Sequence, residues 1–226
     1  MEAPKHVGII LDGNRRYAKR LGLKPWKGHE EGAKRLKEVI LKSMGLGIRN
    51  LTLYIFSTEN FNRSKIEVEF LMLLFRRGFK EVEKQEEIME NVRIHFAGQL
   101  ALFSDDMQER MAALEKKTEK NTRMTLNMAM AYGGRDEIVN TVRKIIDKNI
   151  PSKDITEETI KENLFISEDA DLIIRTSGEK RLSGFLPWQG TYAELIFVDK
   201  MWPEFTENDL VACVEEFNSR KRRFGR

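Results

Sequence analysis

Apolar runs alternate with amphipathic segments along the whole chain. The runs are mostly five or six residues long and predict buried β-strands; they span 7–11, 51–56, 92–97, 122–131, 171–175 and 194–198. Between them, apolar positions recur at helical spacing and predict helices over 17–21, 28–44, 65–91, 104–120, 134–150, 156–165 and 206–222. Strands that alternate with helices predict an α/β fold, here one domain over residues 1–226 with a mainly parallel six-stranded sheet flanked by helices.

The longest predicted helix, 65–91, contains a section that is apolar around its whole circumference, Phe70-Leu71-Met72-Leu73-Leu74-Phe75. Such a section is expected to be buried on more than one side. Two interpretations stay open: the section packs wholly into the core, or part of its surface lines an apolar cavity.

Composition is that of an ordinary globular protein, with 41% hydrophobic and 33% charged residues in a chain of 226. The net charge of +3 gives no overall field that would attract nucleic acid, but the segment 219–226 is strongly basic. This tail has three interpretations: RNA binding, contact with a membrane surface, or a solvated helix end.

The single cysteine, Cys213, excludes an intramolecular disulfide and lies on an apolar helical stripe, so we expect a buried thiol in a reducing compartment. The three histidines are too far apart to match a zinc-binding spacing. We find neither a signal peptide nor a run of the roughly 20 apolar residues that a membrane span needs. We therefore expect a cytoplasmic protein, associated at most with the surface of a membrane.

The first predicted strand ends on Asp12-Gly13-Asn14-Arg15-Arg16, where a turn leads into a helix. The free N–H groups of a helix start, together with two arginines, favour an anion such as phosphate. Asp12 would repel that anion unless a divalent cation lay between them. The stretch therefore predicts a metal-bridged diphosphate site. The alternative is a plain strand–helix corner with Asp12 as the N-cap.

Two further polar segments follow predicted strands: Ser57-Thr58-Glu59-Asn60 after the second, and 175–183 after the fifth. Ligands of open parallel sheets bind at the carboxyl ends of the strands, so we expect these segments to meet there. The later segment carries a second anion-binding set, separate from the first, made of cations and hydroxyls: Arg175, Lys180, Arg181, Thr176, Ser177 and Ser183. Two anion sites beside an apolar helix predict two phosphorylated substrates, at least one of which has an apolar body.

Collinear blocks of the sequence match the signature segments of a known family. These blocks lie at 6–19, 57–63, 175–183, 188–189, 192–195, 202–205 and 222–225. On these blocks the chain resembles the cis-prenyltransferases, the undecaprenyl (polyprenyl) diphosphate synthase family.

That resemblance implies an enzyme that condenses isopentenyl diphosphate repeatedly onto an allylic diphosphate, such as farnesyl or geranylgeranyl diphosphate, with Mg²⁺ as cofactor. The product would be a long-chain cis-polyprenyl diphosphate, the precursor of a glycosyl carrier lipid. The resemblance also implies a homodimer, a hydrophobic tunnel between the sheet and the long helices, peripheral membrane contact for product release, and no nucleic-acid partner.

The resemblance further assigns roles to individual residues. Asp12 and Asn60 would be catalytic, and Asp12 and Glu194 would hold Mg²⁺. Arg223 and Gly225 would reach isopentenyl diphosphate across the dimer. Residues after the first strand would cradle the allylic diphosphate, and residues after the fifth would bind isopentenyl diphosphate. The substrate-binding residues would be Gly13, Asn14, Arg15, Arg16, Tyr17, His29, Ser57, Thr58, Glu59, Phe61, Arg63, Arg175, Arg181, Leu182 and Ser183.

Five positions depart from the family pattern, among them Lys180, where a histidine is common, and Gly184, where an asparagine is common. Pro25 stands where an arginine often binds the allylic diphosphate, so Lys24 or Lys27 is the expected substitute. Tyr17 replaces a usual tryptophan. Ile55 is larger than the residue that is frequent on the strand facing the tunnel, which predicts an effect on product length.

Two alternative functions stay open: a non-catalytic partner subunit of a prenyltransferase, and an RNA-binding module that uses the basic C-terminal tail. The intact Asp12 block argues against the first, and the second leaves the block at 175–183 unexplained. An all-helical trans-prenyltransferase would need two aspartate-rich motifs, whereas this chain has one imperfect copy at 105–109. An aspartyl phosphatase would need a second aspartate where Ile10 stands.

Overall fold

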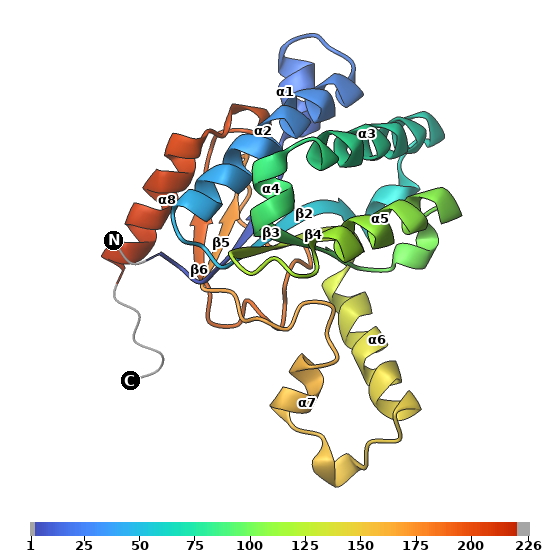
Figure 1. Ribbon diagram of the computed structural model, residues 1–226. Coiled ribbons are helices and arrows are strands. Elements are labelled where there is room, and N and C mark those ends of the chain that lie inside the picture. The colour runs from blue at the N-terminus through green and yellow to red at the C-terminus, as the bar shows by residue number, and fades with distance from the viewer. Residues whose placement is uncertain (1–2, 221–226) are drawn as a thin grey trace.

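Six strands form one sheet in the computed structural model, which describes residues 3–220 (Figure 1). Every neighbouring pair is parallel, and the strand order is β3-β4-β2-β1-β5-β6. The strands are β1 His6–Ile10, β2 Asn50–Ser57, β3 Val92–Ala97, β4 Met124–Tyr132, β5 Leu172–Arg175 and β6 Glu194–Phe197. The predicted α/β fold with a parallel six-stranded sheet is confirmed. The predicted dimer contacts Arg223 and Gly225 lie outside the described residues.

Strand β1 occupies the middle of the sheet. It pairs with β2 on one side and with β5 on the other, and all of its residues are buried. A strand without polar alternation must be covered on both faces, which explains its central position.

Helices cover one face of the sheet, where α2, α3, α4, α5 and α8 lie together (Figure 1). Their apolar sides form the larger core cluster, which includes Val39 on α2, Phe75 on α3 and Met107 on α5. The helices are α1 Asn14–Arg20, α2 Pro25–Gly45, α3 Lys65–Glu83, α4 Glu86–Asn91, α5 Asp105–Thr118, α6 Gly134–Asp147, α7 Glu157–Lys161 and α8 Glu207–Ser219.

The opposite face carries a smaller core cluster. There, Ile166, Phe185 and Leu186 from two connecting segments pack with Ile10 and Ile173 of the sheet. On this side α6 and α7 extend away from the sheet (Figure 1). The connecting segments, one of which follows β5, therefore cover this face of the sheet at the carboxyl end of β1.

Two helices differ most from their predicted bounds. The segment 65–91 is broken at Gln85 (φ −93°, ψ 89°), and the new direction of α4 brings Ile88 into the core. The helix predicted over 156–165 ends at Lys161. Beyond it, the amides of Phe165 and Ile166 donate to the buried carboxylate of Glu137 instead of continuing the helix.

The apolar section of α3 is buried on two sides, as predicted, and part of its surface lines a cavity, but one side remains exposed. Leu71 and Phe75 lie in the core and Leu74 lines a cavity, but the side chain of Leu73 is 43% exposed. The reason is that α3 lies at the surface of the domain, with one face on the core and the neighbouring face on the cavity.

Other sequence expectations concern the cysteine and the membrane. Cys213 is buried on α8, and burial raises the pKa of its thiol to about 12, as expected for a structural thiol. Among residues 3–220, we find no helix that is both long and apolar enough to span a bilayer.

Candidate active site

Three polar segments meet at the carboxyl edge of the sheet, where the sequence had placed them. Ile10 at the end of β1 pairs with Tyr54 of β2 and with Arg175 of β5, so the segments that follow these strands are neighbours. The chain leaves β1 toward β2 and returns to the other side of β1 only at β5. Such a reversal of strand order creates a crevice at the carboxyl edge, the usual ligand site of open α/β sheets.

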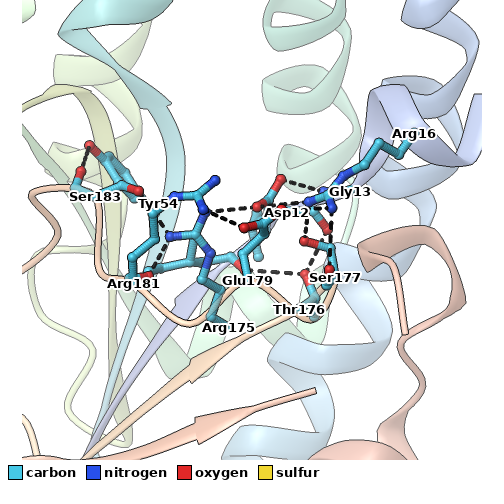
Figure 2. Close-up of polar contacts among 12 residues, drawn as sticks. Asp12, Gly13, Arg16, Tyr54, Arg175, Thr176, Ser177, Glu179, Arg181 and Ser183 are labelled. Atoms are coloured by element: carbon cyan, nitrogen blue, oxygen red, sulfur yellow. Dashed lines mark hydrogen bonds and ion pairs between the residues drawn. The ribbon is translucent and has the colours of Figure 1, made fainter. Parts of the chain in front are cut away.

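Asp12 lies at the centre of this edge (Figure 2). Its Oδ2 accepts hydrogen bonds from Arg175 Nη2 at 2.8 Å and from Arg16 Nη2 at 3.2 Å, and its Oδ1 accepts from the amide of Gly13 at 2.7 Å. Burial of Asp12 opposes ionisation, but the hydrogen bond and charge of Arg175, then Ser177 and Arg16, hold the pKa of Asp12 below its ordinary value. Asp12 is therefore an anion held between two guanidinium groups.

The turn after Asp12 depends on Gly13. Its φ of 103° belongs to the left-handed region, and a Cβ there would lie 2.8 Å from the side chain of Met201. Gly13 therefore occupies the N-cap position of α1, and the alternative in which Asp12 caps this helix is wrong. Asn14 is anchored by a hydrogen bond from its Nδ2 to the carbonyl of Leu11 at 3.0 Å.

The two anion-binding sets, predicted to be separate, are joined. Arg175 donates to Asp12, to Ser183 Oγ at 2.9 Å and to the carbonyl of Arg181. Arg16 reaches across from α1 to Ser177 Oγ at 2.5 Å and forms an ion pair of 3.0 Å with Glu179 (Figure 2). Two cationic walls, one with Arg16 on α1 and the other with Arg175 at the end of β5, therefore face each other across the shared carboxylate of Asp12.

A cavity of about 1690 Å³ extends from Asp12 between the sheet and helices α2 and α3. Its apolar lining includes Leu36, Leu74, Ile88 and Leu126. It exceeds the about 300–1,000 Å³ that is usual for pockets of drug-sized ligands. The predicted site residues that line it are Asp12, Gly13, Asn14, Arg15, Arg16, His29, Ser57, Glu59, Asn60, Arg63, Arg181 and Ser183. The predicted hydrophobic space between sheet and long helices is therefore present.

Some predicted residues stand behind the cavity wall. Thr58 Oγ1 donates to Asp136 Oδ2 at 3.1 Å, and the Phe61 ring packs edge-on against Phe56 with centroids 4.8 Å apart. The predicted substrate-binding residues that do not line the cavity are Tyr17, Thr58, Phe61, Arg175 and Leu182, and the Tyr17 ring lies against the Arg20 guanidinium at 5.5 Å.

Glu194 lies away from this cluster. It opens β6 and pairs in register with Leu172, which in turn pairs with Val7 at the amino end of β1. Its Oε2 accepts a hydrogen bond from Arg220 Nη1 at 2.8 Å. Within one chain, the structure does not bring Glu194 to Asp12.

Asn60 follows β2 in a short 3₁₀ turn. Its Oδ1 accepts the amide of Ser57 at 3.1 Å, which closes a capping box. Within residues 3–220, its Nδ2 donates no hydrogen bond, so a donor remains for a ligand in the cavity.

The segment around Pro25 supplies fewer cations than predicted. Pro25 opens α2 and lines the cavity, but Lys24 lies over the Trp26 ring at 5.1 Å and Lys27 pairs with Glu30 at 2.6 Å. Neither expected substitute lines the cavity, whereas Lys19 does.

Sequence reasoning missed Glu67, on the first turn of α3. Its carboxylate lies 3.1 Å from Arg63 and 3.7 Å from Arg15. The one local signal was its spacing of four residues from Arg63, which is too common on helices to single out a site.

His29 is neutral at physiological pH. Burial, with the charges of Arg63 and Arg15, lowers the pKa of His29 to about 4. Its Nε2 is buried and has no hydrogen-bond partner among the described residues, at 3.8 Å from Glu67.

This burial predicts acid sensitivity. Between about pH 6.5 and 4 the unfolded chain binds the His29 proton and the folded chain does not, so stability falls as the pH decreases through this window. From pH 7 to 4.5 we expect this residue to cost about 2 kcal/mol. Urea unfolding at both pH values should show a smaller loss for His29→Gln than for the wild type. Equal losses would contradict the assignment.

Comparison with known proteins decides the family. Residues 10–225 match the family model of undecaprenyl diphosphate synthase, named Prenyltransf. The chain belongs to this family. It is therefore a prenyltransferase, and the predicted resemblance, fold and transferase class are confirmed.

Relatives of this prenyltransferase include an isoprenyl transferase of Thermus thermophilus, 44% identical over 99% of this chain and 89% of the relative. A tritrans,polycis-undecaprenyl-diphosphate synthase (geranylgeranyl-diphosphate specific) of Thermococcus kodakarensis is 45% identical over 99% and 87%. Among solved structures, lavandulyl diphosphate synthase from Lavandula x intermedia, in complex with dimethylallyl diphosphate, is similar with a TM-score of 0.92, at 34% identity and 99% coverage of both chains.

Proposed function

We propose that this prenyltransferase condenses isopentenyl diphosphate sequentially onto an allylic diphosphate, with Mg²⁺, to give a long-chain cis-polyprenyl diphosphate. The observation that carries the proposal is the Asp12 cluster, where two cationic walls share one carboxylate at the mouth of a large apolar cavity. Such a mouth suits two diphosphates, and the cavity suits an apolar chain that grows. The product would serve as the precursor of a glycosyl carrier lipid.

The α1 wall would bind the allylic substrate. Arg15 and Arg16 line the cavity, and Arg63 and His29 lie beside them. As the allylic C–O bond breaks, negative charge grows on the departing diphosphate, and guanidinium donors fixed beside it stabilise that charge. Arg16 is bound to Asp12 and Glu179 in the free protein, so a diphosphate would exchange with these carboxylates.

The opposite wall would bind isopentenyl diphosphate through Arg175, Arg181 and Ser183. Arg175 is buried, and its bonds to Ser183 and to the carbonyl of Arg181 fix both residues around it. The new carbon–carbon bond joins C4 of isopentenyl diphosphate to C1 of the allylic chain, and a proton leaves C2. Asn60, with its unused Nδ2, would orient the diphosphate oxygen that accepts this proton.

The residues at this edge fit a Mg²⁺ ion that arrives with diphosphate. Residues 3–220 contain no group of three or more histidine, cysteine, aspartate or glutamate side chains that could hold a metal. Mg²⁺ commonly takes one or two carboxylates, with substrate phosphates as its remaining ligands, and Asp12 is such a carboxylate. When bound, the ion would neutralise charge on the leaving diphosphate. Glu194 would contribute only if Arg220 released it.

Product length is expected to depend on Ile55, which lines the cavity from β2. Each CH₂ group that enters the apolar cavity is stabilised by about 0.8 kcal/mol, so elongation stops where space ends. Ile55→Ala should lengthen the product and Ile55→Trp should shorten it, as measured by mass spectrometry of the extracted lipids. The exposed residue Leu102 provides the control Leu102→Ala. Unchanged lengths with activity retained would contradict this role.

A homodimer is proposed through α6, which extends away from the sheet (Figure 1). Ile138, Val139, Val142 and Ile146 are 37–65% exposed on this helix, an unusual apolar content for a solvated surface. A second copy would cover the stripe about a twofold axis.

The proposed dimer predicts that a charged substitution on α6 lowers the mass of the protein in solution from that of a dimer to that of a monomer. Val142→Glu places a charge in the proposed interface and should give a monomer by sedimentation velocity at micromolar concentration, with the helical content unchanged. Leu102→Glu, on another exposed apolar residue, should sediment like the wild type. If the Val142→Glu protein remained a dimer, the proposal that α6 forms the interface would be wrong.

Membrane contact for product release is proposed at the cavity mouth. Leu21 and Leu23 are exposed there, and Leu23 and Lys19 also line the cavity. Lys19 and Lys24 form no ion pair within the described part of the chain, and such cations favour an anionic lipid surface.

The proposed reaction is tested by incubating the purified protein with labelled isopentenyl diphosphate, Mg²⁺ and either farnesyl or geranylgeranyl diphosphate. We expect label in organic-soluble product only when primer and metal are both present. Absence of transfer with every primer, from protein that is folded, would overturn the proposal and leave the non-catalytic partner subunit as the better account.

A further inference from the structure

Glu67 is a buried carboxylate that contacts three residues of the proposed allylic site. The residue is 6% exposed. Its Oε1 lies 3.1 Å from Arg63 Nη1, 3.7 Å from Arg15 Nε and 3.8 Å from His29 Nε2. The three contacts come from different elements: the loop before α3, helix α1 and helix α2.

The local sequence fixes Glu67 in this place. Ser64 caps α3, and its Oγ accepts the amide of Glu67 at 3.4 Å. The carboxylate therefore lies at a defined position on the first turn, four residues after Arg63. Because the Glu67 carboxylate is buried, loss of its arginine partners would leave an uncompensated negative charge and destabilise the fold. Loss of the carboxylate would likewise leave the two arginines without a compensating charge.

Arg15 and Arg63 are neighbouring positive charges that a carboxylate between them would stabilise. Both line the cavity, and each lowers the pKa of the neighbouring His29 by its positive charge. The pKa of the Arg63 guanidinium is lowered, first by burial and also by the positive charge of Arg15. The negative charge of Glu67 acts in the opposite direction and raises this pKa. Two like charges that face one cavity repel each other, so without a carboxylate between them they would separate.

We propose that Glu67 is a positioning residue that holds Arg15 and Arg63 together as a preformed pair of donors for the allylic diphosphate. This inference rests on the proposed function. Glu67 touches no substrate; it acts by fixing the two guanidinium groups before the substrate arrives, which reduces the ordering needed on binding.

A simpler role makes the opposite prediction. If Glu67 only neutralised charge, its removal would leave the cavity more positive and a diphosphate would bind more tightly. If Glu67 positions the arginines, its removal lets them separate, and the diphosphate binds more weakly. The sign of the change in affinity therefore distinguishes the two roles.

The test uses Glu67→Gln in the full chain, with farnesyl diphosphate and Mg²⁺ as the probe and no isopentenyl diphosphate, so that no turnover is required. By calorimetry we expect the dissociation constant to rise about tenfold, the effect of roughly 1.4 kcal/mol. Glu67→Asp, which keeps the charge on a shorter side chain, should have a dissociation constant between those of the wild type and Glu67→Gln. Glu69→Gln is the matched control, because Glu69 is exposed on the same helix and pairs only loosely with Lys65 at 3.9 Å.

A second readout separates positioning from general destabilisation. In steady-state kinetics, Glu67→Gln should raise KM for farnesyl diphosphate about tenfold and leave KM for isopentenyl diphosphate within about twofold. A merely structural role would move both together. Unchanged or tighter farnesyl diphosphate binding by Glu67→Gln would overturn the inference. If the wild type itself bound no farnesyl diphosphate, the proposed function would fail instead.

Discussion

Asp12→Asn is expected to lower kcat at least about a thousandfold while the protein stays folded. The substitution keeps the shape of the side chain but removes the charge that Arg175 and Arg16 share. It also removes the carboxylate proposed to hold Mg²⁺ at the diphosphates. A thousandfold loss corresponds to about 4 kcal/mol of barrier, within the several kcal/mol that a metal-handling ligand contributes.

Single-turnover measurement with farnesyl and labelled isopentenyl diphosphates checks this result. Circular dichroism and thermal unfolding should show that the variant is folded. Asp105→Asn is the control, since Asp105 is an exposed aspartate on α5 and should leave kcat unchanged. If Asp12→Asn kept more than about a tenth of the wild-type rate, a loss of only 1.4 kcal/mol, Asp12 would not have the central role given to it here.

The second large effect is expected at Arg175, which lies against the cluster from the opposite side. Arg175 is 4% exposed and donates to Asp12, Ser183 and the carbonyl of Arg181. Arg175→Met removes charge-assisted bonds of about 1.5–3 kcal/mol each, so KM for isopentenyl diphosphate should rise about a hundredfold. KM for the allylic substrate should change far less.

The same substitution should lower the free energy of unfolding. Asp12 and Ser183 lose their common donor, and we expect a cost of about 2 kcal/mol, less than for a fully buried pair because Asp12 is partly exposed. Urea titration measures this cost. Arg123→Met, at an exposed arginine before β4, is the control for loss of positive charge. Equal increases in both KM values would indicate a general disturbance and not a specific site for isopentenyl diphosphate.

Local sequence patterns were sufficient for most of the fold. The apolar run at 7–11 predicted a buried strand of a parallel sheet, and the structure buries every residue of β1. The same reasoning placed Asp12 and the segment 175–183 at one edge, because parallel strands end together. These features depend on hydrophobic periodicity and on the alternation of strands with helices, both of which can be recognised in the sequence.

Other features depend on contacts between distant segments. Arg16 and Arg175 were assigned to separate sets, because nothing in the sequence indicates that both reach Asp12. The break before α4 arises from tertiary packing of Ile88, not from a proline or glycine. Glu67 was missed for the same reason, since its contact with Arg15 crosses from α3 to α1.

The most direct measurement is a crystal structure of the protein with Mg²⁺, isopentenyl diphosphate and a farnesyl diphosphate analogue whose bridging oxygen is replaced by sulfur. We expect the two diphosphates on either side of Asp12. One would lie on Gly13, Arg15 and Arg16, and the other on Arg175, Arg181 and Ser183, with the farnesyl chain in the cavity. Diphosphates bound elsewhere, or a cavity left empty beside bound substrates, would contradict the account.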